Sequence, residues 1–218
     1  MRPRLLDLFC GGGGASMGYW LAGFEVVGVD IGKRGRYPFA HFQADALEFV
    51  RMYGRDFDAI HASPPCQAYS RLAARHPERE YPDLIEPTRE ALQATGKPYV
   101  IENVPEAPLI EPVVLCGSSF FLGTNDEQYQ LRRHRAFETN WPLMGRSCCH
   151  DERPVISVAG HAGRASRNLS GTTLERREAM RIPWLASDAI AEAIPPDYAH
   201  EIGWQLRNYL ELQEEAVA

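Results

Sequence analysis

Short apolar runs alternate with turn residues and with helical patterning over the first half of the chain. Residues 5–9, 26–30 and 57–61 have the length and composition of buried strands, and each run is followed by glycine, proline or polar residues. Helical spacing of apolar positions follows at residues 15–22 and 83–95. Strands and helices that alternate at these lengths predict a mostly parallel sheet in an α/β domain.

The second half of the chain has a different pattern. After a further strand at residues 99–101, short strand-like pieces such as 136–138 and 155–158 are separated by Gly, Pro and Ser. Helical patterning returns at residues 174–180 and again from Tyr198 to the C-terminus. These elements predict additions to the same domain, since the sequence contains no internal repeat and no low-complexity segment.

Length and composition limit the class of protein. A chain of 218 residues is long enough for one α/β domain with a full hydrophobic core. No apolar run approaches the length that spans a membrane, and the N-terminus does not resemble a cleavable leader. Five cysteines, an odd number, disfavour a disulfide framework. We therefore expect a soluble, cytoplasmic protein with no membrane partner.

Charge is unevenly distributed along the chain. The net charge of −6 disfavours a generally basic nucleic-acid binder. Residues 131–181, however, contain ten arginines, no lysine and five acidic residues. Because the planar guanidinium suits phosphate recognition, this block is where a polyanion would bind. An ordinary solvated surface explains the arginines equally well.

A glycine run follows the first predicted strand, at residues 11–14. It does not match the dinucleotide fingerprint, because the sixth position from Gly11 is Ser16, and it lacks the lysine of a phosphate-binding loop. Asp30, at the end of the second strand, is placed to bind ribose hydroxyls, and Asp45 to contact an adenine edge. These features favour a nucleoside without phosphates; the alternative is a tight turn with ordinary capping carboxylates.

Cys66 lies in a stiff loop directly after the strand at residues 57–61. Pro64 and Pro65 fix their own φ angles and restrict the residues before them, so the thiol is presented on a rigid turn. This setting favours a nucleophile over a buried structural thiol.

Cys148, Cys149 and His150 are a second group of candidate ligands. Adjacent cysteines without a second spaced pair make a poor zinc site, and we therefore expect no bound metal.

Five short motifs occur in one order along nearly the whole chain. They are Asp-Leu-Phe-Cys-Gly-Gly-Gly-Gly at 7–14, Pro-Pro-Cys-Gln at 64–67, Glu-Asn-Val at 102–104, Arg-His-Arg at 133–135 and Ile-Pro-Pro at 194–196. With these motifs the chain resembles the DNA (cytosine-5) methyltransferases. The resemblance implies a Rossmann-like S-adenosylmethionine-dependent methyltransferase fold, a mostly parallel sheet with helices on both faces, plus a small irregular or β recognition segment.

The resemblance also implies roles for individual residues. Cys66 would add to C6 of a cytosine rotated out of the duplex, and Glu102 would hold N3 and the exocyclic amine. Arg133 and Arg135 are the candidates for raising the thiolate fraction of Cys66. The S-adenosylmethionine pocket would be lined by Phe9, Gly12, Gly14, Asp30, Ile31, Asp45, Pro65 and Glu192.

The segment that would read the target sequence is short. We expect a catalytic, donor-binding domain at 1–138, a reduced target-recognition segment at 139–173, and C-terminal helices at 174–218 that complete the domain. A short segment predicts a short or relaxed recognition sequence. The candidate DNA contacts are Gln67, Ser70, Arg146, Arg153, Arg164 and Arg167, with residues 160–163 as a loop facing the groove.

Several interpretations remain open at this stage. The first is a compact, phage-type or solitary DNA methyltransferase, or one of a restriction-modification system, which would act as a monomer on double-stranded DNA, in the host cytoplasm if phage-encoded. The second is a transfer RNA cytosine-5 methyltransferase. The third is a catalytically weak DNA-binding protein on the same scaffold, since Leu131 and Glu192 replace residues that are common in the family. A nicotinamide oxidoreductase is disfavoured by the missing dinucleotide fingerprint.

Overall fold

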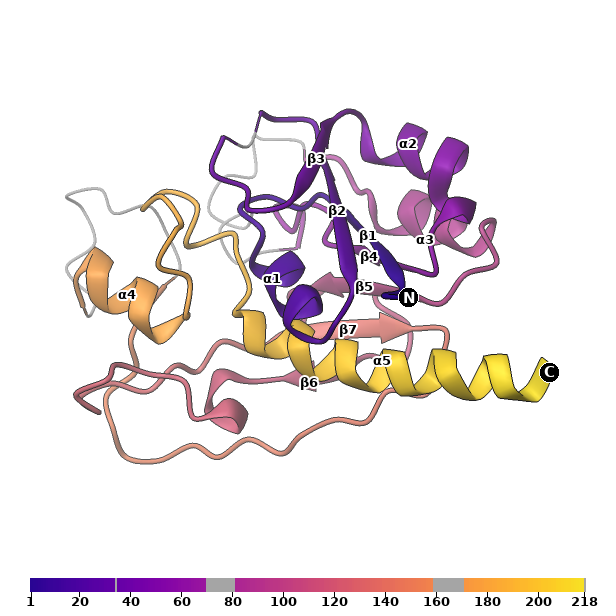
Figure 1. The fold of residues 1–218 in the computed structure, drawn as a ribbon. Coiled ribbons are helices and arrows are strands. Elements are labelled where there is room, and N and C mark those ends of the chain that lie inside the picture. The colour runs from indigo at the N-terminus through magenta and orange to yellow at the C-terminus, as the bar shows by residue number, and fades with distance from the viewer. Residues whose placement is uncertain (34, 70–80, 159–170, 218) are drawn as a thin grey trace.

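A seven-stranded sheet forms the centre of the protein (Figure 1). The computed structural model describes residues 1–33, 35–69, 81–158 and 171–217. The strand order is β3-β2-β1-β4-β5-β7-β6, and β7 is antiparallel to both of its neighbours while the remaining pairs are parallel. The strands are β1 (Arg4–Leu8), β2 (Glu25–Asp30), β3 (Ala40–Gln43), β4 (Ala59–Ala62), β5 (Tyr99–Asn103), β6 (Val113–Leu115) and β7 (Arg135–Thr139).

Helices cover both faces of the sheet, as the sequence predicted. The α-helices are α1 (Gly14–Leu21), α2 (Ala46–Tyr53), α3 (Ile85–Gln93), α4 (Thr173–Ala179) and α5 (Pro196–Val217). Short 3₁₀ turns are η1 (Gly54–Asp56) and η3 (Gly117–Phe120). Helices α1 and α5 pack together on one face, and α2 and α3 on the other, which makes this a doubly wound α/β fold.

Alternation along β1 explains the two cores. Leu5 belongs to the core beneath α1 and α5, whereas Leu6 and Leu8 belong to the core beneath α2 and α3. Successive side chains of a strand point to opposite faces, so a continuous apolar run is needed where both faces are buried. The same reason explains why the runs that predicted strands are mainly apolar on both faces.

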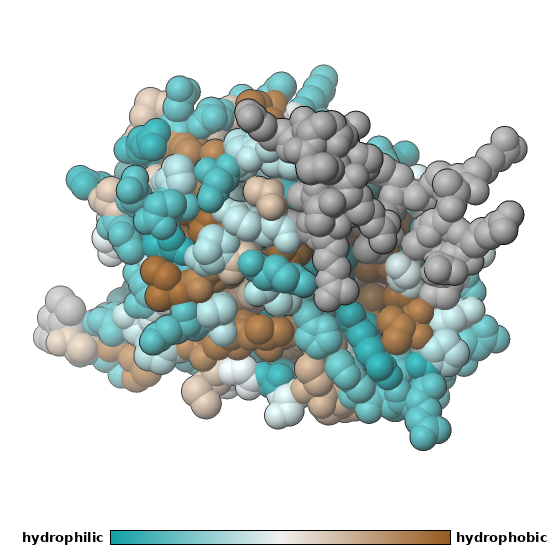
Figure 2. Space-filling model, turned by 180° about the vertical axis from the view of Figure 1, so that it is seen from behind, coloured by the Kyte–Doolittle hydropathy of each residue, from teal (hydrophilic) through white to brown (hydrophobic). Residues whose placement is uncertain are grey.

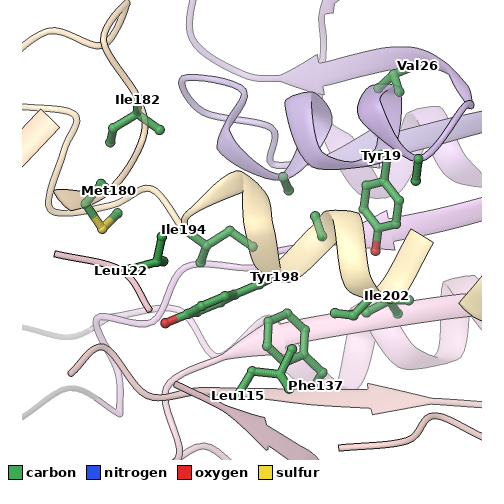
Figure 3. Close-up of a cluster of buried hydrophobic side chains, with 14 of the residues drawn as sticks. Tyr19, Val26, Leu115, Leu122, Phe137, Met180, Ile182, Ile194, Tyr198 and Ile202 are labelled. Atoms are coloured by element: carbon green, nitrogen blue, oxygen red, sulfur yellow. The ribbon is translucent and has the colours of Figure 1, made fainter. Parts of the chain in front are cut away.

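The long C-terminal helix α5 holds the antiparallel part of the sheet against α1. Tyr198 of α5 meets the ring of Phe137 of β7 edge-on, with centroids 6.2 Å apart (Figure 3). A Cβ on Gly18 of α1 would lie 2.2 Å from the Pro196 carbonyl oxygen, so glycine is required where the two helices approach. The C-terminal helix is therefore an integral part of the domain.

Two local predictions differ from the structure. Residues 155–158 are not a strand: the pairing of Val155 with Gln130 is an isolated bridge and not part of a ladder, and Ile156 and Val158 are buried by packing. Helix α2 was not expected, although Asp45 caps it by accepting a hydrogen bond from the Glu48 amide. The strands expected in the first half are present, within two residues of their predicted ends.

The face opposite to the view of Figure 1 mixes hydrophilic residues with separate groups of hydrophobic ones (Figure 2). Within the described residues, no helix combines the length and the apolarity needed to span a bilayer.

Candidate active site

The candidate site lies at the carboxyl ends of β1 and β4, where the strand order reverses. From β1 the chain continues to β2 on one side, and from β4 it continues to β5 on the other. Open α/β sheets bind ligands in the crevice at this position. The Ser63 amide donates to the Leu8 carbonyl over 3.2 Å, so the loop that carries Cys66 is tied to the glycine turn after β1.

A buried histidine supports the Cys66 loop from below. One ring nitrogen of His61 lies 3.0 Å from the Tyr19 hydroxyl of α1, and the other lies 2.9 Å from the Ser63 hydroxyl. Burial lowers the pKa of His61 to about 3, so the ring is neutral near pH 7 and links β4 to α1 by hydrogen bonds. The residue acts as a support for the loop.

Asn103 anchors the two-proline turn from the neighbouring strand. Its side-chain amide donates to the Pro64 carbonyl over 2.9 Å, and its side-chain oxygen accepts from the Val104 amide. Asn103 is buried, and this contact fixes the distance between the end of β5 and the backbone that carries Cys66. This role of Asn103 was not predicted from the sequence, although its position directly after Glu102 at the end of a strand was a usable signal.

Glu102 and Arg135 form a largely buried ion pair beside Cys66. Arg135 Nε of β7 lies 3.0 Å from the Glu102 carboxylate of β5, and the side chains of Arg135 and Glu102 are 14% and 8% exposed. Parallel pairing aligns Ala62 of β4 with Ile101, so Glu102 lies level with the start of the Cys66 loop. The structure thus brings Glu102 and Arg135 together beside Cys66, and Arg133 is close enough to influence the pKa of Cys66 as well.

Burial raises the pKa of the Cys66 thiol, and this effect outweighs the nearby cations. Arg135 is the strongest opposing influence, Glu102 reinforces the rise, and Arg133 opposes it more weakly. The two arginines therefore act in the predicted direction. They do not make Cys66 a thiolate in the resting protein, because burial destabilises the thiolate more than the charge of Arg135 stabilises it.

Arg133 contacts the segment that precedes α5. Its guanidinium donates to the carbonyls of Ala191 and Ala193 over 2.7 and 2.8 Å. The backbone carbonyl of Arg133 accepts a hydrogen bond from the Tyr198 hydroxyl. Burial lowers the pKa of Arg133 to about 9. Its contacts assign it a role in positioning this segment, so a direct part in catalysis stays a prediction.

The segment held by Arg133 lies beside the glycine turn. A Cβ on Gly14 would come within 2.3 Å of the Ile194 carbonyl, and the Trp184 indole donates to the Gly12 carbonyl over 3.0 Å. Glu192, which is exposed, belongs to this segment. The fold therefore brings Glu192 near the turn from the other end of the sequence, which is consistent with the predicted grouping of cofactor residues.

Asp30 organises the glycine turn. Its two carboxylate oxygens accept hydrogen bonds from the backbone amides of Gly11, at 3.0 Å, and Gly32, at 2.9 Å. Phe9 begins the turn with φ of 57°, a conformation that non-glycine residues seldom adopt. The next residue after Asp30, Ile31, is 76% exposed.

Two further predicted pocket residues lie at the rim. Asp45 is exposed and caps α2, so one of its oxygens is already engaged. Pro65 is half-buried in the turn before Cys66. Contacts of these residues with a donor stay predictions.

Asp7 lies beneath the glycine turn and is almost fully buried. The Ser16 hydroxyl donates to one of its oxygens, while the other, Oδ1, is buried without a partner among the described residues. Burial raises the pKa of Asp7 to about 7, and the Ser16 hydrogen bond only partly offsets this. A carboxyl that titrates near neutrality therefore adjoins the predicted donor pocket.

Within the described part of the chain, the residues predicted to contact DNA do not lie together as the predicted catalytic residues do. Arg146 pairs with Glu201 of α5 at 2.6 Å and lies over the Phe120 ring, and Arg153 pairs with Asp151 at 2.7 Å. Gln67 is exposed one residue beyond Cys66. Three predicted contacts, Ser70, Arg164 and Arg167, and the loop 160–163 lie outside the described residues.

Comparison with known proteins is consistent with this geometry. The chain is 31% identical to a protein of Oceanobacillus iheyensis named as a type II methyltransferase, over 48% of this chain and 29% of that one. It is 30% identical to the type II methyltransferase M.XorII of Xanthomonas oryzae, over 47% of this chain and 28% of that one. The chain thus spans less than a third of the length of these curated relatives. No protein-family model matches it.

Solved methyltransferases share the fold over nearly the whole chain. The S. pombe Dnmt2 methyltransferase superposes with a TM-score of 0.58 at 11% identity, covering 98% of this chain and 99% of that one. The Entamoeba histolytica methyltransferase EhMeth superposes with a TM-score of 0.54 at 12% identity, covering 96% and 98%. The Rossmann-like methyltransferase fold predicted from the sequence is confirmed; at these identities the likeness concerns the fold alone.

Proposed function

We propose that the protein transfers a methyl group from S-adenosylmethionine to C5 of cytosine in DNA. The observation that carries the proposal is the arrangement at the switch point: Cys66 on a loop anchored by Asn103, beside the buried Glu102–Arg135 pair. A thiol, a carboxyl and a guanidinium are the groups that addition to a pyrimidine ring needs.

The residues around the glycine turn fit an adenosyl donor. The turn offers close backbone approach and contains no lysine or arginine, which disfavours a phosphate. The Asp30 carboxylate is held at the end of β2 beside the turn by the Gly11 and Gly32 amides, and a carboxylate at this position suits ribose hydroxyls. Exposed Ile31 offers an apolar surface to the base, and the Glu192 carboxylate suits a cationic ligand. When bound, S-adenosylmethionine supplies an electrophilic methyl group on its sulfonium.

Cytosine C5 is too weakly nucleophilic to accept this methyl group without help. Cys66 must lose its proton and add to C6, a step that Arg135 favours and the Glu102 carboxylate opposes. A proton shared between Glu102 and cytosine N3 removes that opposition and stabilises the adduct. C5 then takes the methyl group, and loss of the C5 proton with elimination of Cys66 restores the aromatic ring.

The choice of DNA as the polymer rests on the arginine-rich block and on the resemblance. Residues 131–181 carry the ten arginines, but within the described residues Arg146 and Arg153 are already paired with carboxylates. Those pairs are at the surface, where phosphate can compete for the guanidinium. Base rotation out of a duplex costs about a few kcal/mol, which phosphate contacts must offset.

A labelling experiment tests both the reaction and the polymer. The protein is incubated with methyl-labelled S-adenosylmethionine and either duplex DNA or transfer RNA, and the digested nucleosides are analysed for 5-methylcytosine. We expect the product in DNA with the parent protein and with Cys149→Ala, and none with Cys66→Ala. Product in RNA alone would replace DNA as the substrate, and product from Cys66→Ala would refute the covalent mechanism.

A trapping experiment tests the adduct directly. DNA that contains 5-fluorocytosine cannot lose a proton from C5 after methyl transfer, so Cys66 should stay bonded to C6. We expect a protein–DNA complex that survives denaturing electrophoresis and maps to Cys66 by peptide mass. A complex mapped to another cysteine would contradict the assignment.

A further inference from the structure

Two cysteines and two histidines from three separate segments meet at the edge of the sheet. Cys116 follows β6, His134 directly precedes β7, and Cys148 and His150 belong to the chain after β7. One ligand atom from each residue lies within 4.8 Å of those of the other three. All four groups are side chains that bind soft or borderline metal ions.

The distances match a tetrahedral zinc site. Cys116 Sγ lies 3.4 Å from His150 Nε2, and Cys148 Sγ lies 3.4 Å from His134 Nε2. Zinc bonds of about 2.3 Å to sulfur and about 2.0–2.1 Å to nitrogen, at tetrahedral angles, place neighbouring ligand atoms roughly 3.3–3.8 Å apart. The four atoms therefore need only small shifts to surround one ion.

A second layer of contacts already orients the ligands. The Ser118 hydroxyl donates to Cys116 Sγ over 3.3 Å and accepts from the Cys149 amide over 3.1 Å. The rings of His134 and His150 meet edge-on, with centroids 5.4 Å apart and planes at 88°. Hydrogen bonds to a ligating thiolate and fixed ring orientations are features of built metal sites.

The surrounding chain has almost no regular secondary structure. From the end of β7 at Thr139 to residue 158, the structure contains neither helix nor strand, and an isolated bridge at Val155 is the exception. An ion at this position would join the segment to the sheet edge. His134 is also the residue between Arg133 and Arg135, so the same ion would fix the start of β7.

We propose that Cys116, His134, Cys148 and His150 bind one structural Zn²⁺ ion. The four protein ligands complete a tetrahedron and leave no open position for a reacting water, so the role is structural. The proposal does not depend on the methyl-transfer reaction. It departs from the expectation of no metal because Cys116 and His134 are distant in sequence from Cys148 and His150.

Metal analysis of tag-free protein tests the proposal. We expect about one zinc ion per chain after purification without chelator, as structural sites retain their metal. Cys116→Ala and Cys148→Ala should lose the zinc, whereas Cys149→Ala, which changes the adjacent exposed cysteine, should keep it. Zinc content that is equal in all variants would place the metal elsewhere and overturn the proposal.

A titration of the parent protein covers the case in which the variants fail to fold. Reduced, metal-free protein is titrated with Co²⁺, which is expected to give the intense visible bands of tetrahedral coordination and a sulfur-to-metal charge-transfer band. Zn²⁺ should then abolish both signals at a ratio of about one ion per chain. Absence of these bands, or the weak spectrum of octahedral Co²⁺, would refute the site.

Discussion

Replacing Asp7 by asparagine should make the protein less sensitive to pH. Asp7 has a folded-state pKa of about 7, against an ordinary value of 3.8, because burial disfavours the carboxylate. Between these two pH values the folded protein holds a proton that the unfolded chain has lost. The free energy of unfolding therefore falls as pH rises through this range.

The magnitude follows from the size of the pKa difference. Each pKa unit corresponds to about 1.36 kcal/mol, so the full difference amounts to about 4 kcal/mol. Between about pH 5 and pH 8, the titration of Asp7 lowers the free energy of unfolding by about 3 kcal/mol. The side chain of the Asp7→Asn variant would not titrate, while its amide occupies the place of the unpartnered Oδ1, which costs about 1–3 kcal/mol at any pH.

Urea unfolding of the parent protein and Asp7→Asn at several pH values measures the effect. We expect the variant to gain about 3 kcal/mol relative to the parent between about pH 5 and pH 8. Ser16→Ala removes the donor to the Asp7 carboxylate and should move the transition to higher pH. A stability difference between parent and Asp7→Asn that does not change with pH would refute the reasoning.

Two other predictions concern the Cys66 loop. Asn103→Ala should lower the free energy of unfolding by about 1–3 kcal/mol, measured by urea unfolding, because a buried carbonyl of Pro64 loses its donor; an unchanged value would mean that water replaces the amide. Glu102→Gln should lower and Arg135→Met should raise the pKa of Cys66, measured from the pH dependence of iodoacetamide alkylation. Shifts of the same sign in both variants would contradict the electrostatic assignment.

Much of the sheet could be predicted from the sequence because both of its faces are buried. Strands β1, β2, β4 and β5 are short, mainly apolar runs bounded by Gly, Pro or polar residues, and such runs are recognisable without knowledge of their neighbours. The segment at residues 155–158 has the same composition, but it lies where no neighbouring strand among the described residues is available for a ladder. Composition indicates burial, while pairing depends on the rest of the fold.

The candidate site divides in a similar way. Cys66 was indicated by its two-proline loop, because proline constrains the chain locally, and Glu102 was indicated by the resemblance of its motif to that of a known family. Their environment could not be predicted from the sequence. Burial raises the pKa of Cys66 even though Arg135 is close, and the balance between these two effects depends on how much water the folded chain excludes. Arg133 was assigned to Cys66 from its motif, yet its guanidinium reaches the carbonyls of Ala191 and Ala193.

Residue patterns were enough to specify the class of fold, the succession of strands along the chain and the residues that can perform chemistry. Which of these residues meet depends on the folded domain. Asn103 reaches Pro64 across 39 positions, and Cys116 meets His150 across 34, because neighbouring strands and the antiparallel return of β7 bring their ends to common edges. Local residue preferences act over a few positions, whereas contacts of this kind are set by packing of the whole domain.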